Sequence, residues 1–410
     1  MSSTDHTHTA CPYAATGQEI QQGLDHHGFD HLDPQLGERT LWATYQALLE
    51  RPHVHRSSRH GGFWVLSHYQ DVKGALRDWE TFSSADGHRI PHVEGMGTIP
   101  IDFDPPSHGP YRDLVVHALR PDRVRQLQPF VKTTIEGLVD RLVAAGGGDV
   151  VTELALPLPL TVLQELVGFS ADAVAQFREL TAKVWAEGSP EAQLRGRAAL
   201  ATLIEDEIIS HKRDRPDDYL TWLIDAEVEG RPVRHDEVVS ACLSLAVAGH
   251  ETTMNSVGSL VYLLASVPDV QDRLRRDPGQ APAFVEEMLR LRTPSQCSAR
   301  RVARDVEVDG EVLQAGDWVL LLNGAANRDE QQFDHPDEFD LDRSARGHLA
   351  FGWGIHQCVG SALARMELRI LLETLARHPR LSLAGEPTFS ALEAGNHYGP
   401  TSLPIRFEEA

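Results

Sequence analysis

The chain has 410 residues, of which 41% are hydrophobic, 24% charged and 7% aromatic, and this composition excludes disordered and collagen-like proteins in favour of a globular one with a large core. Its net charge of −22 predicts a surface that repels nucleic acid and anionic lipid. Neither a signal peptide nor a run of about 18 apolar residues occurs, so we expect a cytoplasmic protein without a membrane span.

The N-terminal region combines polar stretches with short periodic segments. Residues 1–35 are rich in His, Asp, Gly and Pro, which predicts an irregular lead-in. Apolar spacing predicts a helix over 41–49, alternation predicts a strand within 61–69, and residues 71–79 predict another helix. The Gly-, Pro- and Ser-rich stretch 80–107 is too irregular for a long element, so we expect a loop that serves as a substrate lid.

The rest of the chain is mainly helical. Helical periodicity runs from 108 to about 290, and strand signals return at 300–323, where an Asp-Gly pair at 309–310 predicts a turn between short strands. A final helix is expected over 359–378. No linker or internal repeat divides the sequence, so we expect a single domain over 36–410, mainly α with a small β-rich lobe.

The cysteines and histidines form no recognisable disulfide or zinc pattern. The pair His250 and Glu251 begins like the helix of a zinc hydrolase, but Met254 occupies the place of the second histidine. The cysteines are too scattered for a disulfide framework or a paired-cysteine zinc site. They are Cys11, Cys242, Cys297 and Cys358.

Residues 351–360, FGWGIHQCVG, are the most specific segment of the sequence. Three glycines surround Cys358, and glycine tolerates the tight turns that bring a backbone close to a bound group. A helix is expected to begin just after the cysteine, where backbone N–H groups and the helix dipole stabilise a thiolate. The segment therefore predicts a cysteine with a chemical role.

A second unusual segment, AGHETT at 248–253, lies within an otherwise apolar helical stretch. Burying Glu251 and Thr252 there is costly, so we expect them to have a role or to face a cavity. The Thr252 hydroxyl can donate to the carbonyl of Ala248, four residues earlier, which bends the helix and opens a pocket. Ser244 shares the same helical face.

Both segments resemble those of the cytochrome P450 family, whose patterns are Phe-Gly-x-Gly-x-His-x-Cys-x-Gly and Ala-Gly-x-Asp/Glu-Thr-Thr. The resemblance implies the cytochrome P450 fold, a single large domain around one buried haem b, with Cys358 as the iron ligand whose thiolate favours O–O cleavage. It also implies that Ala248 lines the haem and that Glu251 and Thr252 relay protons to dioxygen. The loop residues assigned to the haem are Phe351, Gly352, His356, Cys358 and Gly360.

The resemblance extends to the partners of the haem propionates. The family supplies basic groups from a His-x-x-x-Arg helix, matched by His108 and Arg112, and from the histidine of the cysteine loop, His356. It also supplies an arginine from the strand after its Glu-x-x-Arg helix. Counting from both sides favours Arg300 for that place over the adjacent Arg301.

Three further residues match a structural element of the family. Glu287 and Arg290 fit its Glu-x-x-Arg pair, and Arg343 matches the arginine that locks the pair in place. One departure is Pro110, which stands where the family commonly has an arginine. The change removes a positive charge from the face where an electron donor would dock.

Taken together, the motifs imply a haem-thiolate monooxygenase that inserts one oxygen atom from O₂ into a small organic substrate, by hydroxylation or oxidative dealkylation. Electrons would come ultimately from NAD(P)H through a separate ferredoxin and ferredoxin reductase. A haem-thiolate peroxygenase or isomerase is the alternative enzyme, although a buried proton relay argues against it. A haem-binding sensor without turnover is the alternative from another class.

Candidate substrate contacts lie on three segments. Ser244 and Ala248 belong to the distal helix, and Ser295 follows the Glu-x-x-Arg helix. In the 80–107 loop, Arg89 or His92 would anchor a carboxylate or hydroxyl of a compact aromatic or terpenoid-like substrate.

Overall fold

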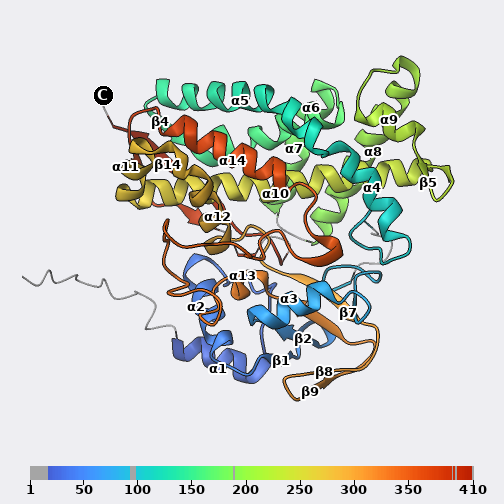
Figure 1. The fold of residues 1–410 in the computed structure, drawn as a ribbon, viewed down its shortest axis with the longest axis vertical. Coiled ribbons are helices and arrows are strands. Elements are labelled where there is room, and N and C mark those ends of the chain that lie inside the picture. Colours follow the sequence, from blue (N-terminus) through green and yellow to red (C-terminus); the bar gives the residue numbers. More distant parts are fainter. Residues whose placement is uncertain (1–16, 93–97, 188–189, 390, 393–394, 409–410) are drawn as a thin grey trace, which may run out of the picture.

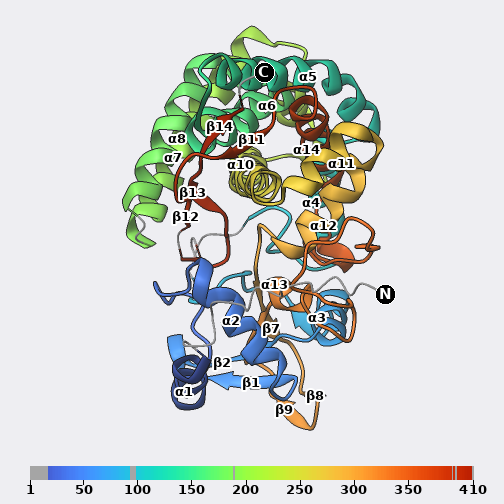
Figure 2. The same ribbon diagram turned by 90° about the vertical axis from the view of Figure 1, so that its left-hand side faces the viewer.

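The computed structural model describes residues 17–92, 98–187, 190–389, 391–392 and 395–408. Figures 1 and 2 show a larger helical region joined to a smaller region that holds the largest sheet. The expected mainly α architecture with a small β-rich lobe is confirmed. Within the described part of the chain, no helix is long and apolar enough to cross a membrane.

Most helices belong to the larger region, and α10, with 32 residues, runs through its middle (Figure 2). The short helical turns are η1 (Arg59–Gly61), η2 (Val151–Ala155), η3 (Pro278–Gln280) and η4 (Gly354–His356). The α-helices are α1 (Gly17–His27), α2 (Glu38–Leu49), α3 (Tyr69–Arg77), α4 (His108–Ala118), α5 (Pro121–Ala144), α6 (Pro157–Val167), α7 (Ala171–Glu187), α8 (Pro190–Asp214), α9 (Tyr219–Asp225), α10 (His235–Ser266), α11 (Pro268–Arg276), α12 (Ala281–Leu291), α13 (Asn323–Ala326) and α14 (Ser361–Leu375).

The largest sheet joins distant parts of the chain in the order β1-β2-β10-β7-β3. Its strands are β1 (Val54–Ser57), β2 (Phe63–Leu66), β3 (Phe82–Ser83), β7 (Ser298–Val302) and β10 (Trp318–Leu321). β10 lies parallel to β2 and antiparallel to β7. The N-terminal strands are thus completed by strands that come after α12.

Smaller sheets brace the rest of the molecule. Strand β14 lies between β11 and β4 and ties the end of the chain to the segment that follows α5. The remaining strands are β4 (Gly147–Asp149), β5 (Glu227–Val228), β6 (Arg231–Pro232), β8 (Val306–Val308), β9 (Glu311–Leu313), β11 (Leu381–Leu383), β12 (Thr388–Phe389), β13 (Pro400–Ser402) and β14 (Pro404–Phe407).

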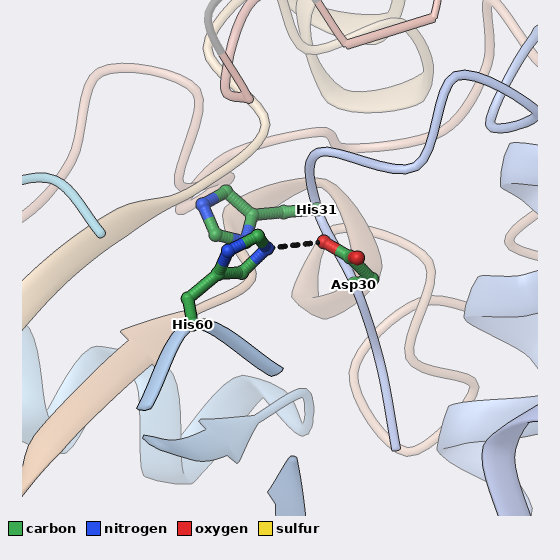
Figure 3. A group of neighbouring side chains, drawn as sticks. All are labelled: Asp30, His31 and His60. Atoms are coloured by element: carbon green, nitrogen blue, oxygen red, sulfur yellow. Dashed lines mark hydrogen bonds and ion pairs between the residues drawn. The ribbon is translucent and has the colours of Figure 1, made fainter. Parts of the chain in front are cut away.

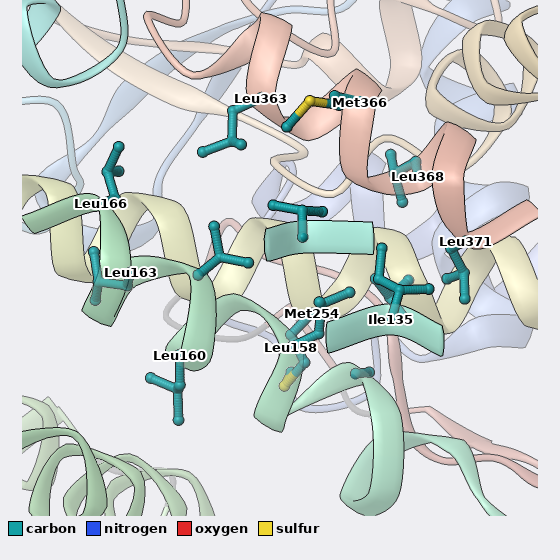
Figure 4. Close-up of a cluster of buried hydrophobic side chains, with 14 of the residues drawn as sticks. Ile135, Leu158, Leu160, Leu163, Leu166, Met254, Leu363, Met366, Leu368 and Leu371 are labelled. Carbon is teal, nitrogen blue, oxygen red and sulfur yellow. The ribbon is translucent and has the colours of Figure 1, made fainter. Parts of the chain in front are cut away.

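The main hydrophobic core lies where α5, α6, α10 and α14 meet (Figure 4). Leu158 of α6 and Ile135 of α5 are fully buried there, as is Leu368 of α14. Helix α10 is covered on most sides, and its residues are apolar around nearly the whole helix, as expected for a buried helix. Polar residues in its middle therefore need partners or open space.

The structure confirms several expected elements and corrects one. The helices predicted over 41–49 and 71–79, the strand within 61–69 and the Asp-Gly turn between β8 and β9 are present. The lead-in 1–35 is not wholly irregular, because α1 forms within it. Arg51, just after α2, donates to Gln21 and Asp25 of α1 and fixes this helix. Residues 1–16 lie outside the described part.

The loop expected over 80–107 is confirmed as mainly irregular. It contains only the two-residue strand β3, and its residues 93–97 lie outside the described part. The backbone N–H of Ile99 donates to Ser240 of α10 at 3.3 Å. The described part of the loop therefore contacts the central helix.

Candidate active site

The cysteine loop is held in shape by its own backbone and by α3. The N–H of Cys358 donates to the carbonyl of Phe351 at 2.9 Å. Gly352 and Gly354 have φ of +64° and +73°, a region that favours glycine. A Cβ atom at Gly354 would lie 2.4 Å from the carbonyl oxygen of Leu76. Only glycine therefore lets the loop pack this closely against α3.

The thiol of Cys358 is subject to opposing influences. The residue is exposed, yet burial among protein atoms raises its pKa. The backbone N–H groups of Gly360 and Ser361 and the charges of Arg112 and Arg365 act in the opposite direction and favour the thiolate.

The middle of α10 faces open space. Ala248 and Gly249 are exposed although most of this helix is buried. The Thr252 hydroxyl donates to the carbonyl of Ala248 at 2.7 Å, the bond that the sequence predicts. Ser244, one turn earlier, is buried. The helix thus offers a short polar and small-residue stretch beside accessible volume.

Glu251 has a partner that the sequence does not indicate. His397, in the segment before β13, places Nδ1 2.8 Å from Glu251 Oε2. Burial alone would raise the pKa of Glu251; His397, together with Arg89 and His250, lowers it to about 2. Glu251 is therefore an ionised carboxylate at neutral pH.

A group of basic side chains gathers beside the cysteine loop. The rings of His108 and His356 lie 4.6 Å apart, edge to face. Burial lowers the pKa of His356 to about 2, helped by the charges of Arg300, His108, Arg112 and His88. These residues come from α4, β7, the lid loop and the cysteine loop. The structure thus brings the four predicted propionate partners together.

This basic group has the chemistry that two carboxylates require. His108 Nε2 and His356 Nδ1 are buried and have no hydrogen-bond partner among the described residues. Burial lowers the pKa of Arg300 to about 10, and its Nη1 donates only to the neighbouring carbonyl of Ala299 at 2.7 Å. Anionic propionates would supply the missing acceptors. The residues present therefore fit a haem.

Arg300 and Arg301 face opposite sides of β7. Arg300 is 4% exposed and belongs to the basic group. The Arg301 guanidinium lies 5.1 Å from the centroid of the Trp318 ring, within the range of a cation–π contact. Arg112 donates to the carbonyl of Gln357 at 2.6 Å and so also holds the loop.

The Glu-x-x-Arg pair is fully buried. Arg290 donates from Nε and Nη2 to the two carboxylate oxygens of Glu287, both at 2.8 Å. Arg343 donates to the same carboxylate at 3.1 Å. The remaining N–H groups of Arg290 bond the carbonyls of Asn327 and Pro336. The three residues link α12 to the segment that precedes the cysteine loop.

The predicted substrate contacts separate into two groups. Arg89 lies near Glu251 and Cys297, since its charge lowers the pKa of both. The backbone of Ser295 pairs with that of His397, the partner of Glu251. Ser295 therefore belongs to the same group as Arg89. His92 lies outside this group, because it is exposed and stacks on Trp318.

A second arginine, which sequence reasoning did not identify, lies near Arg89. Burial and the charge of Arg89 both lower the pKa of Arg197 in α8, and Arg197 donates to Thr98 of the 80–107 loop at 2.8 Å. The only signal in the sequence is a charged residue within a helical segment; that its position is half-buried is known only from the structure. Arg197 is therefore held against the 80–107 loop, near Arg89.

Comparisons with known proteins agree with this geometry. A family model described as Cytochrome P450 matches residues 152–393. Cytochrome P450 107B1 of Saccharopolyspora erythraea is 38% identical over 84% of this chain and 89% of its own length. Nocardicin C N-oxygenase of Nocardia uniformis is 33% identical over 83% and 89%. The structure of cytochrome P450 CYP109Q5 from Chondromyces apiculatus is 31% identical, covers 91% of this chain and 96% of that one, and has a TM-score of 0.81. The chain belongs to the cytochrome P450 family, which are haem-thiolate monooxygenases.

Proposed function

We propose that this protein inserts one oxygen atom from O₂ into a small organic acid, by hydroxylation or oxidative dealkylation. A haem held by Cys358 supplies the activation of O₂ when it is bound. The observation that carries the proposal is the bond from Thr252 to Ala248, which leaves a polar stretch beside accessible volume in the buried helix α10. This arrangement suits a site where protons must reach a small ligand.

Proton delivery at this site would use Glu251 and its partner. The carboxylate of Glu251 has a pKa of about 2, so it must first accept a proton before it can donate one. His397 Nδ1 lies 2.8 Å from Oε2. We therefore assign His397 the role of passing a proton to Glu251. Thr252 would position the site where the proton is finally accepted.

The substrate class follows from Arg89 and Arg197. Neither arginine forms an ion pair with a carboxylate among the described residues, although Glu251 lies near Arg89 and Asp102 near Arg197, and the charge of Arg89 lowers the pKa of Arg197. A carboxylate on the substrate would relieve this repulsion and accept charge-assisted hydrogen bonds. An aromatic or terpenoid-like acid bound this way would lie against Ser244, Ala248 and Ser295. His92 has no part in this site.

Electrons would arrive at the side of the cysteine loop that carries Arg112 and Arg365. The charges of these two arginines act on Cys358, and Arg365 is partly exposed. Arg365 also pairs with Glu286 at 2.6 Å, so Arg112 supplies most of the positive charge that an acidic ferredoxin would meet there, against a net charge of −22. Its reductase would draw on NAD(P)H. We place this system in the cytoplasm, where NAD(P)H is available to the reductase.

The proposal is tested by turnover with isotopically labelled O₂, NAD(P)H, a ferredoxin and its reductase. Aromatic and terpenoid acids are compared with their neutral amides. We expect label in the product of the acid, consumption of NAD(P)H, and weak or no binding of the amide. Product formed only with hydrogen peroxide would instead establish a peroxygenase, and binding without any product would establish a carrier.

A further inference from the structure

Three potential metal ligands meet in the smaller region, apart from the cysteine loop. Asp30 and His31 lie between α1 and α2, and His60 lies in η1, the turn before β2. One ligand atom of each residue lies within 4.8 Å of the other two. Figure 3 shows the three side chains turned toward one another.

His31 is held in the state in which an imidazole binds metal. Its Nε2 lies 2.6 Å from the carbonyl oxygen of Ile90, and a carbonyl only accepts, so Nε2 carries the proton. Nδ1 then presents a lone pair. This atom is buried and has no hydrogen-bond partner within the described ranges, and the residue is 3% exposed. Histidine ligands of metals commonly donate their other N–H to a backbone carbonyl in this way.

Asp30 and His60 complete the group from the solvent side. Asp30 Oδ1 accepts the N–H of Leu32 at 2.9 Å and lies 2.7 Å from His60 Nε2. His60 has φ of +50°, a conformation unfavourable for most residues other than glycine. This backbone conformation places its ring edge to face with that of His31, at 5.6 Å. The His60 side chain is 24% exposed, which leaves a route for an ion.

We propose that Asp30, His31 and His60 bind one divalent transition-metal ion, and that zinc is the ion they suit best. Two imidazole nitrogens and one carboxylate oxygen are ligands that zinc accepts in a tetrahedral site, with water at the fourth position. The ion would clip the segment before α2 to η1. Through the hydrogen bond from His31 to Ile90 it would also steady the lid loop next to Arg89.

A second group with the same residue types provides an internal contrast. His53, His68 and Asp71 also lie within 4.8 Å of one another. There, however, both ring nitrogens of His68 have partners, the carbonyl of Leu49 at 3.1 Å and Ser67 Oγ at 3.4 Å. No buried lone pair is left over at His68, so we expect no tight site in this group.

The test is calorimetric titration of the full-length holoprotein with Zn²⁺ after treatment with a chelator. His60→Asn is the main variant, because asparagine tolerates positive φ, and Asp30→Asn is the second. His53→Asn is the matched control in the contrasting group. We expect the wild type and His53→Asn to bind one tight ion that the other two variants bind at least tenfold more weakly.

Two further readouts separate this site from the other histidines of the chain, which His60→Asn and Asp30→Asn retain. Zinc-edge X-ray absorption should show two imidazole ligands in the wild type. Zn²⁺ should raise the Tm of the wild type and of His53→Asn, but not that of His60→Asn or Asp30→Asn. Equal stoichiometry and affinity in all four proteins, or no tight binding in any, would overturn the proposal.

Discussion

Glu287→Gln is expected to destabilise the fold strongly, although it changes a single atom. The carboxylate of Glu287 is completely buried and accepts from Arg290, from Arg343 and from the backbone N–H of Asp340. A neutral amide would leave two buried guanidinium groups without their counterion, and its NH₂ group would face N–H donors. Breaking a buried ion pair by removing one partner costs about 3 to 5 kcal/mol.

This cost corresponds to a measurable change in Tm. An unfolding entropy of ~2.1 cal/mol/K per residue gives about 0.86 kcal/mol/K for 410 residues. A loss of about 3 to 5 kcal/mol therefore lowers the Tm by roughly 4 to 6 °C. Thermal unfolding of the haem-loaded protein, followed by far-ultraviolet circular dichroism, measures the shift.

Glu373→Gln is the matched control. Glu373 pairs with Arg369 at 2.6 Å on α14, but their side chains are 35% and 33% exposed. The same substitution there should cost no more than about 0.5 kcal/mol, because water screens the pair. Equal shifts in Tm for the two variants would refute the reasoning from burial.

Other predictions concern the site itself. Thr252→Ala should keep the haem spectrum but divert electrons to hydrogen peroxide, measured as peroxide formed per NAD(P)H consumed, and full coupling would remove Thr252 from proton delivery. Arg89→Ala should weaken binding of a carboxylate substrate at least tenfold in a spin-state titration and leave the amide unaffected; equal binding of the acid by variant and wild type would contradict the anchor. The pKa of Glu251 is lowered from 4.5 to about 2, so its stabilising effect is complete above about pH 4.5 and disappears as the pH falls toward 2. Glu251→Gln should therefore reduce stability at neutral pH but not near pH 2, and a loss independent of pH would contradict the pairing with His397. Cys358→Ser should abolish the red-shifted Soret band of the reduced, carbon monoxide-bound protein, and its retention would exclude Cys358 as the ligand.

Those features of the site that depend on local backbone geometry could be predicted from the sequence, because only one residue type meets the geometric requirement. Gly354 is required by a close approach to α3 and a positive φ, so the loop around Cys358 could be predicted from its glycines. The bond from Thr252 to Ala248 depends only on helical spacing. Both features follow from local geometry, and both are present as expected.

Features that depend on tertiary contacts could not be predicted. His397 lies 146 positions after Glu251, and no periodic pattern connects them. Arg197 approaches Arg89 only because α8 packs beside the lid. Helix α1 has two glycines and only two large apolar residues, Ile20 and Leu24, so its stability depends on contacts with Arg51 that the local sequence does not show.

The pairing of β2 with β10 has a consequence for synthesis of the protein. About 250 residues separate the two strands, so at ~5 to 20 residues per second a ribosome needs roughly 12 to 50 s to deliver β10 after β2. During that time β1 and β2 form only a two-stranded hairpin, which is marginally stable in water. All four residues of β2, Phe63–Leu66, are apolar and buried in the finished sheet. Slower growth at low temperature, or extra holdase chaperone, should therefore raise the soluble yield by protecting this nascent edge.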